Sequence, residues 1–111
     1  MIDIIHRDGC ACGKVRYEVK GNPQVSAACH CKYCQQRSES AFGTLVYLSE
    51  KNFKIISGKC NTFNFISESG YNWTNHFCKT YAITLISRLE IKLGYVGVAG
   101  GTFDPPNFCT I

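Results

Sequence analysis

Apolar and polar residues alternate with a period of two along several short segments of the chain. In residues 14–20 the alternation places Val15, Tyr17 and Val19 on one face and charged side chains on the other. Residues 61–66 and 73–77 alternate in the same way, with aromatic residues on one face. Because successive side chains of a strand point to opposite faces of its sheet, the pattern predicts half-buried antiparallel strands.

Turn residues separate further segments that favour strands. Residues 41–48 are nearly all apolar, which predicts a strand buried on both faces. The other predicted strands cover residues 25–29, 53–56, 83–85 and 91–96. A polar stretch at residues 35–40 is predicted to form the one short helical segment. About eight short strands with this segment predict an all-β sandwich or sheet assembly.

The aromatic residues allow two interpretations. The chain has seven Phe, six Tyr and one Trp, enough for a platform on which nucleic-acid bases could stack. Their placement among β-branched residues with a period of two favours packing in the core instead. The net charge is +4, but the Lys and Arg residues are scattered rather than clustered in a stripe. We therefore expect no nucleic-acid partner.

Length and composition predict one domain, residues 1–111, with a single modest core. No run of about 18 apolar residues is present, so a membrane span is not expected. The first residues lack the apolar stretch of a signal peptide, which favours a cytoplasmic protein. In that reducing compartment, the eight cysteines are expected to be thiols, metal ligands or redox groups.

Three of these cysteines form a C-x-C-x-x-C pattern, Cys29, Cys31 and Cys34. On an extended backbone the first two side chains leave on the same face, and a tight turn returns the third sulfur toward them. Such a group holds a zinc ion at about 2.3 Å per sulfur and leaves one tetrahedral position open. The spacing therefore predicts an open zinc site.

A second C-x-C pair, Cys10 and Cys12, lies between glycines that permit a tight backbone around a metal, and Cys78 stands alone downstream. The alternative is the disulfide framework of a small secreted protein. The close clustering of the cysteines and the expected absence of an export signal favour metal binding.

The motifs that surround these cysteines resemble the glutathione-dependent formaldehyde-activating enzyme family, which includes centromere protein V-like proteins. The resemblance covers nearly the whole chain, from Gly9 to Pro106. The first two motifs are specific in combination, and the others are weak alone. The motifs are Gly9-Cys10-Ala11-Cys12-Gly13 with the following strand, Cys29-His30-Cys31-Lys32-Tyr33-Cys34, Ser40-Ala41-Phe42, Phe77-Cys78 and Gly101-Thr102-Phe103-Asp104-Pro105-Pro106.

This resemblance implies a small twisted β-sandwich with two zinc sites. It assigns Cys29, Cys31 and Cys34 to a substrate-binding, catalytic zinc. It assigns a second, structural zinc to Cys10, Cys12 and Cys78. The implied activity is that of a carbon–sulfur lyase, which condenses glutathione with formaldehyde to S-hydroxymethylglutathione. The expected cofactor is Zn²⁺, and the expected partners are glutathione or another small thiol and formaldehyde.

The sequence departs from the family pattern at three places. Tyr81-Ala82 stands where the family has Cys-Gly, so the structural site is degenerate and lacks one thiolate. A neutral phenol is a poor ligand because its ordinary pKa is about 10. Glu39 occupies a position usually held by glycine, and Gln35 one often held by arginine. The substitutes open for the fourth ligand are His76, Cys60 and Cys109; otherwise the site is vacant.

Two other function classes stay open from the sequence. Glutathione and formaldehyde condense without a catalyst, so the zinc site could serve a non-catalytic interaction or thiol-binding module. A redox or metal-buffering thiol cluster is the third alternative. His30 lies between two of the predicted ligands and is expected to be structural, because on an extended chain its side chain points to the opposite face.

Overall fold

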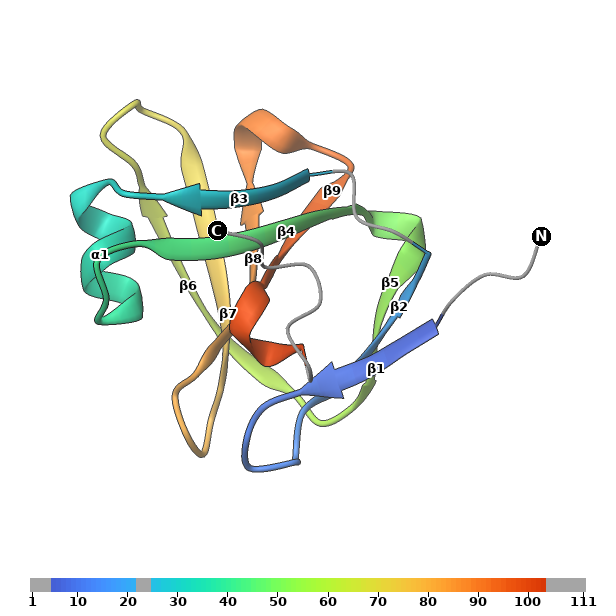
Figure 1. Cartoon of the computed structure of the whole chain (residues 1–111). Coiled ribbons are helices and arrows are strands. Elements are labelled where there is room, and N and C mark those ends of the chain that lie inside the picture. Colours follow the sequence, from blue (N-terminus) through green and yellow to red (C-terminus); the bar gives the residue numbers. More distant parts are fainter. Residues whose placement is uncertain (1–4, 22–24, 104–111) are drawn as a thin grey trace.

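The computed structural model describes residues 5–21 and 25–103. Within these ranges the chain forms nine strands, one α-helix and three short 3₁₀ turns (Figure 1). In chain order the elements are β1 (Ile5–Gly9), β2 (Arg16–Lys20), β3 (Val25–Cys29), α1 (Lys32–Ser38), β4 (Gly43–Ser49), η1 (Glu50–Asn52), β5 (Phe53–Ser57), β6 (Cys60–Ile66), β7 (Asn72–Cys78), β8 (Thr84–Leu89), η2 (Glu90–Lys92), β9 (Tyr95–Ala99) and η3 (Gly100–Thr102).

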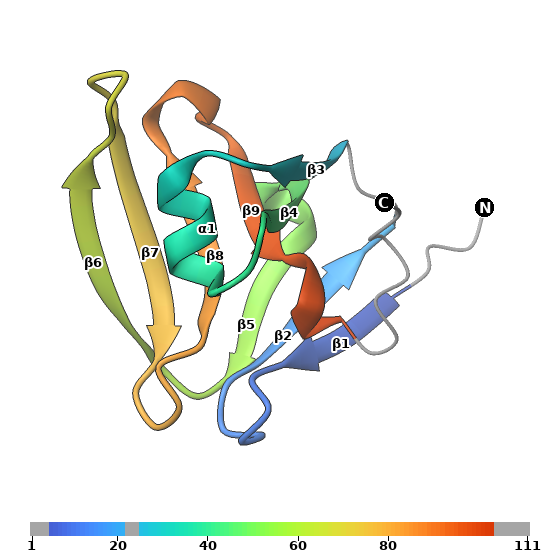
Figure 2. The same ribbon diagram turned by 60° about the vertical axis from the view of Figure 1, so that its left-hand side comes forward.

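The strands form two antiparallel sheets. The smaller sheet has the order β1-β2-β5, and the larger has the order β3-β4-β9-β8-β7-β6. Figure 2 shows the smaller sheet at one end of the molecule and the β6–β7 hairpin at the other. The predicted all-β fold with one short helical segment is confirmed.

The core lies where the two sheets face each other. The predicted alternation in the second strand is confirmed, since Val15, Tyr17 and Val19 are buried. The Tyr17 hydroxyl shares a hydrogen bond of 2.7 Å with the Thr102 hydroxyl, which satisfies the one polar atom of a fully buried ring. The other buried members are Cys10, Val46, Leu48, Phe53, Cys78, Leu85, Ile86, Val96, Val98 and Phe103.

The strand β4 carries the apolar run that predicted burial on both faces. Four consecutive residues from Leu45 to Leu48 are buried, and the strand lies between β3 and β9. Because the side chains on both faces of this inner strand are buried, the strand needs no polar face. This prediction is also confirmed.

Three elements differ from the sequence-based prediction. The helix begins at Lys32 rather than at residue 35, because the Cys31 side chain caps it. Residues 91–96 were predicted as one strand, but η2 and a turn at Gly94 with φ of +87° precede β9. The backbone N–H of Glu50 donates to the Gly94 carbonyl and holds that turn. The first strand, β1, was not predicted.

Some predicted features lie outside the described residues. These are Cys109, the Asp104-Pro105-Pro106 end of the last motif and the Asn22-Pro23 part of an expected turn. Among the residues that the structure does describe, no helix is long and apolar enough to cross a membrane.

Candidate metal centre

Cys29, Cys31 and Cys34 come together at the junction of β3 and α1, and we call them the helix triad. Their sulfur atoms all lie within 4.8 Å of one another. Cys29 ends β3, Cys31 is the N-cap of the helix and Cys34 lies in the first helical turn. Cys34 is buried, whereas Cys31 is exposed. The triad therefore opens to the surface on the Cys31 side.

The start of the helix stabilises the thiolate form of Cys31. The backbone N–H of Cys34 donates to the Cys31 sulfur at 3.3 Å, and this bond lowers the pKa of Cys31. Burial has the opposite effect on Cys34 and raises the pKa of its thiol to about 12. A cation at this position would remove that difference, because metal coordination deprotonates a thiol outright.

A positive charge lies behind the triad. The guanidinium of Arg37 lowers the pKa of Cys34 against the effect of burial. Its Nε and Nη2 atoms are buried and have no hydrogen-bond partner within the described parts of the chain. The helix approaches β4 closely here, since a Cβ atom on Gly43 would lie 2.6 Å from Arg37 Nη2. Gly43 thus makes room for the guanidinium.

Cys10, Cys12 and Cys78 form a second group, which we call the sheet triad. The Cys12 sulfur lies 3.5 Å from that of Cys10 and 3.4 Å from that of Cys78. Cys10 and Cys12 lie in the β1–β2 turn, and Cys78 ends β7 of the larger sheet. The triad therefore connects the two sheets.

Backbone amides also surround the sheet triad. Hydrogen bonds from the backbone N–H groups of Tyr81 and Thr80 lower the pKa of Cys78 to about 7. Burial raises the pKa of Cys10 to about 11. Amide donors directed at sulfur favour a thiolate, which is the protonation state of a metal ligand.

The distances in both triads fit a zinc ion. Sulfurs bound tetrahedrally at about 2.3 Å lie about 3.8 Å from each other. The measured separations of 3.4 and 3.5 Å in the sheet triad, and the limit of 4.8 Å in both, are close to that value. Three thiols at this spacing suit a soft, thiolate-binding ion. The cysteines that the sequence grouped are therefore brought together in two sets.

The structure separates the candidates for a fourth ligand of the sheet triad. Tyr81 is 57% exposed, and the hydrogen bond that it makes to Cys78 comes from its backbone N–H. The ring of His76 contacts Arg88 Nη1 at 3.1 Å. Cys60 is the cross-strand partner of Cys78, and the Cys78 charge contributes to raising its pKa. Cys60 therefore lies beside Cys78 on the neighbouring strand, but it is not part of the group whose ligand atoms all lie within 4.8 Å of one another.

A polar network that the sequence did not reveal supports the helix triad. The Asn75 Oδ1 atom accepts hydrogen bonds of 2.7 Å from both Trp73 Nε1 and Ser87 Oγ. Its Nδ2 donates to the Tyr33 hydroxyl. Asn75 is buried in β7, and Tyr33 lies between two cysteines of the triad. An alternating strand pattern does not distinguish a buried amide from an exposed one, so no sequence signal identified this residue.

The prediction that the aromatic residues pack in the core is wrong for one group. Tyr33, Phe65 and Trp73 contact one another with ring centroids 4.7 to 5.9 Å apart and are only partly buried. Phe63 stacks on this group and is 60% exposed. Tyr33, Phe65 and Trp73 border a cavity of about 410 Å³ that Cys31 also lines. We call this cavity the aromatic cleft.

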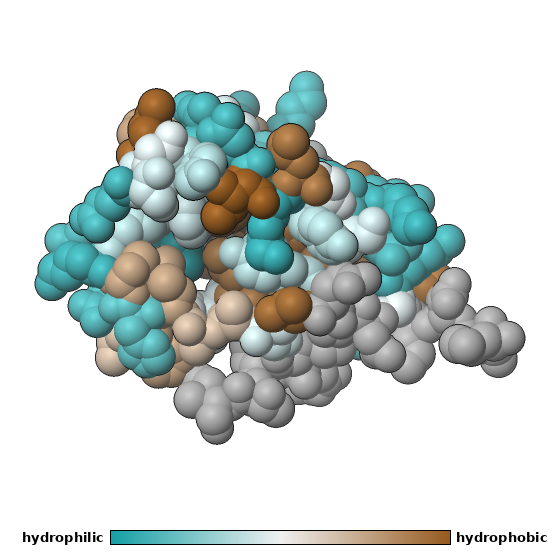
Figure 3. Space-filling model, turned by 90° about the horizontal axis from the view of Figure 1, so that it is seen from above, coloured by the Kyte–Doolittle hydropathy of each residue, from teal (hydrophilic) through white to brown (hydrophobic). Residues whose placement is uncertain are grey.

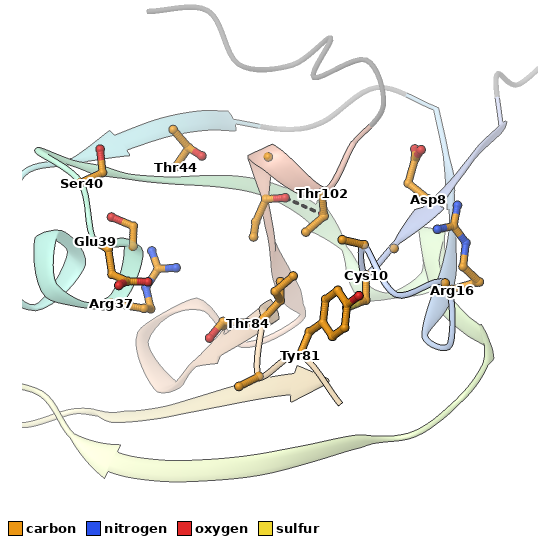
Figure 4. A pocket seen from close by; sticks show the side chains of 18 of the residues that line it. Asp8, Cys10, Arg16, Arg37, Glu39, Ser40, Thr44, Tyr81, Thr84 and Thr102 are labelled. Carbon is orange, nitrogen blue, oxygen red and sulfur yellow. Dashed lines mark hydrogen bonds between the residues drawn. The ribbon is translucent and has the colours of Figure 1, made fainter. Parts of the chain in front are cut away.

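A second cavity, of about 900 Å³, lies between Cys10 of the sheet triad and the end of α1 (Figure 4). Cys10 and Tyr81 line one side, and Arg37 and Glu39 line the other. Basic and acidic side chains are mixed around it, since Arg16 also contributes. This mixture gives the cavity no single charge preference.

Two residues near the triads have a left-handed backbone. Glu39, at the end of α1, has φ of +54°, and Ala82, after Cys78, has φ of +58°. This conformation favours glycine because a Cβ atom crowds the backbone. Both are positions at which the resemblance described above implies glycine, the residue that this backbone conformation favours.

Comparisons with known proteins agree with the fold. The family model described as glutathione-dependent formaldehyde-activating enzyme matches residues 6–110. The chain is also similar to the crystal structure of a Rhodobacter sphaeroides protein, with a TM-score of 0.69 and 18% sequence identity. That similarity covers 86% of this chain and 85% of the other and concerns the fold alone. No curated protein matches the sequence.

Proposed function

Because the chain belongs to the glutathione-dependent formaldehyde-activating enzyme family, we propose that it is a zinc-dependent protein of the carbon–sulfur lyase type. In this proposal it condenses a small thiol with formaldehyde at the helix triad, and glutathione is the thiol that the family name implies. The proposal treats residues 1–111 as one zinc-binding domain and the cytoplasm as its location.

One observation carries the proposal. Three sulfurs converge within 4.8 Å, and the exposed member, Cys31, borders a cavity. A site closed by four protein ligands has no room for a substrate, whereas three ligands with an open side suit substrate binding. Cys29, Cys31 and Cys34 would hold the ion. When bound, the zinc supplies a Lewis-acidic position at which a thiol loses its proton at neutral pH.

The condensation is a balanced addition. The sulfur of the thiolate forms a bond to the carbonyl carbon of formaldehyde, and the carbonyl electron pair moves to oxygen. The thiol has released one proton and the oxygen takes up one, so the protons balance. The product is a hydroxymethyl thioether. No oxidant or reductant is needed.

The side chains around the triad hold it in place in this scheme. The bond from Asn75 to Tyr33 fixes the first turn of α1 against β7. The guanidinium of Arg37 offsets the net negative charge that three thiolates and one divalent ion carry together. The sheet triad has a structural role, since its two ends belong to different sheets.

A specific observation also favours a non-catalytic thiol-binding or interaction module. Among the described residues, the side chain from outside the helix triad that hydrogen-bonds one of its sulfurs is the Arg37 guanidinium, which stays protonated in proteins and is therefore not a general acid or base. His30 is exposed, and its ring packs against Phe42 at 5.3 Å. A site without a proton donor would bind the thiol without accelerating a reaction that proceeds unaided.

Two measurements test the proposal. Elemental analysis of freshly purified reduced protein counts zinc per chain, and exchange NMR follows glutathione and formaldehyde with and without protein. We expect the protein to contain zinc and to accelerate the exchange between glutathione and formaldehyde. Cys31→Ser should reduce both the zinc content and the acceleration. Ala28→Ser, at an exposed residue of β3 outside both triads, is the control for the introduction of a serine near the site. Protein without zinc contradicts both candidate functions, and zinc with unchanged exchange leaves the thiol-binding module.

A further inference from the structure

The aromatic cleft lies beside the exposed member of the helix triad. Its walls come from the first turn of α1, the β6–β7 hairpin and η2. Figure 3 looks onto this end of the molecule and shows hydrophobic side chains at the surface among hydrophilic ones. The volume of about 410 Å³ lies in the range of small-molecule pockets, about 300 to 1,000 Å³. The principal walls are Cys31, Tyr33, Phe65, Ile66, Tyr71 and Trp73.

The aromatic rings present mainly apolar surface to the cleft. The Trp73 indole N–H donates to Asn75, and the Tyr33 hydroxyl accepts from the same amide. Their polar atoms are therefore already satisfied inside the protein. Ile66 and Ile91 add aliphatic surface and are 65% and 57% exposed. Burying such surface against an apolar ligand is favourable by about 25 cal/mol per Å².

The charges that line the cleft do not match glutathione. That tripeptide has two carboxylates and one ammonium group at neutral pH. The charged lining residues in the described parts of the chain are Lys32 and Glu68, one of each sign, and no arginine lines the cleft. Transfer of an unpaired carboxylate into an apolar pocket is costly. An apolar substituent avoids this cost.

We propose that the aromatic cleft binds the apolar, preferably aromatic, organic group of the thiol whose sulfur is bound at the helix triad. This inference rests on the proposed function and names its substrate class, a thiol with an uncharged hydrophobic substituent in place of glutathione. Cys31 belongs to the triad and also lines the cleft, so the sulfur of a thiol bound at the triad and the organic group of that thiol would occupy adjacent spaces.

Trp73 is the only tryptophan of the chain and lines the cleft, so its fluorescence reports directly on ligand entry. We would titrate the zinc-loaded protein with benzyl mercaptan, benzyl alcohol and glutathione, exciting the indole selectively. We expect benzyl mercaptan to change the emission and to bind roughly tenfold or more tightly than glutathione. Glutathione binding as tightly as benzyl mercaptan, or no response to either benzyl compound, would overturn the inference.

Variants separate the cleft from the triad. Ile66→Ala with Tyr71→Ala should abolish the preference for benzyl mercaptan over glutathione. Leu93→Ala, an apolar side chain that is 81% exposed and outside the cleft, should retain it. An equal loss of the preference for benzyl mercaptan in the two variants would contradict the assignment of the cleft as the binding site.

The alcohol distinguishes failure of this inference from failure of the proposed function. The proposed sulfur ligation predicts that the mercaptan binds more tightly than the alcohol, and that Cys31→Ser removes this difference. Equal binding of both compounds by the unmodified protein supports the cleft and contradicts the thiol site. The remaining alternative is that a second copy of the chain fills the cleft, and sedimentation velocity tests it. A dimer that dissociates in the Ile66→Ala, Tyr71→Ala variant would support this alternative and overturn the inference.

Discussion

The side-chain amide of Asn75 donates a hydrogen bond to the hydroxyl of Tyr33, although the two residues lie on different elements. Tyr33 stands between Cys31 and Cys34, and Asn75 is buried in the middle of β7. One buried amide therefore fixes the position of the turn that carries the candidate metal ligands. The consequences can be measured.

Replacement of Asn75 with alanine should destabilise the fold by about 2 kcal/mol or more. The change removes three hydrogen bonds and leaves the buried Ser87 hydroxyl without this partner. Urea unfolding followed by circular dichroism gives the free energy. Asn64→Ala on the adjacent strand is the control, because Asn64 is exposed and bonds to Thr74. Similar losses in both variants would contradict the role of the buried network.

The substitution Ala82→Gly should increase the free energy of unfolding by about 0.5 kcal/mol. The residue has φ of +58°, and relief of the Cβ crowding exceeds the added flexibility of the unfolded chain. Glu39→Gly should act in the same direction. Ala28→Gly in β3, with ordinary strand geometry, should instead destabilise by about 0.5 to 1 kcal/mol. Melting temperatures by calorimetry test all three, and a decrease at Ala82 would refute the strain argument.

A fourth thiol next to the sheet triad should increase the affinity of this site for a metal ion. Tyr81→Cys, which introduces a thiolate beside Cys78, should slow zinc release to a chelator by about tenfold or more. A chromogenic chelator gives the rate. Leu93→Cys, at an exposed position that lines neither cavity, adds a thiol elsewhere on the surface and serves as the control. If Cys60 already completes the site, Cys60→Ser will speed release and Tyr81→Cys will have little effect.

Acid should destabilise the metal-free protein in a way that depends on His76. Burial, and then the Arg88 charge, lower the pKa of His76 below its ordinary 6.5. The unfolded state therefore binds more protons near pH 6, so stability falls as the pH drops below about 7 toward the folded pKa. The His76→Gln variant should have a flatter profile between about pH 5 and 6.5.

A second acid-dependent step belongs to Glu50. The hydrogen bond from Arg88 lowers the pKa of the Glu50 carboxyl below its ordinary 4.5. The folded state holds this group ionised, so its contribution is present above about pH 4.5 and is lost as the pH falls through the folded pKa. Glu50→Gln should remove this step and enlarge the His76 step, because the Glu50 charge opposes the lowering of the His76 pKa. Urea unfolding at closely spaced pH values resolves the two, and a single unchanged profile would contradict both assignments.

The sequence predicted the parts of this structure that depend on local periodicity. The strand β3 has the predicted bounds, and Val15, Tyr17 and Val19 face the core as the alternation required. Both cysteine groups were also found from spacing and family resemblance. The strand alternation and the spacing of the helix triad involve neighbouring residues, so a local pattern specifies them, whereas Cys78 is 66 residues from Cys12 and was assigned to the sheet triad by the family resemblance.

Features that depend on distant contacts could not be predicted. Cysteine is not a usual N-cap, so the start of the helix at Lys32 was missed. The residues from Ile91 to Val96 suit a strand by composition, but the left-handed Gly94 interrupts them. Phe63 has the alternation of a core residue, yet it lies on an edge strand of the larger sheet with no layer above it to bury the ring.

The chain separation within the two triads sets the order in which they can form. Cys31 and Cys34 are three residues apart, so a zinc ion can bind the helix triad while the chain is still unfolded. Cys12 and Cys78 are 66 residues apart, and their sulfurs meet only after β7 has paired. The helix triad is thus suited to early metal capture, whereas closure of the sheet triad completes folding.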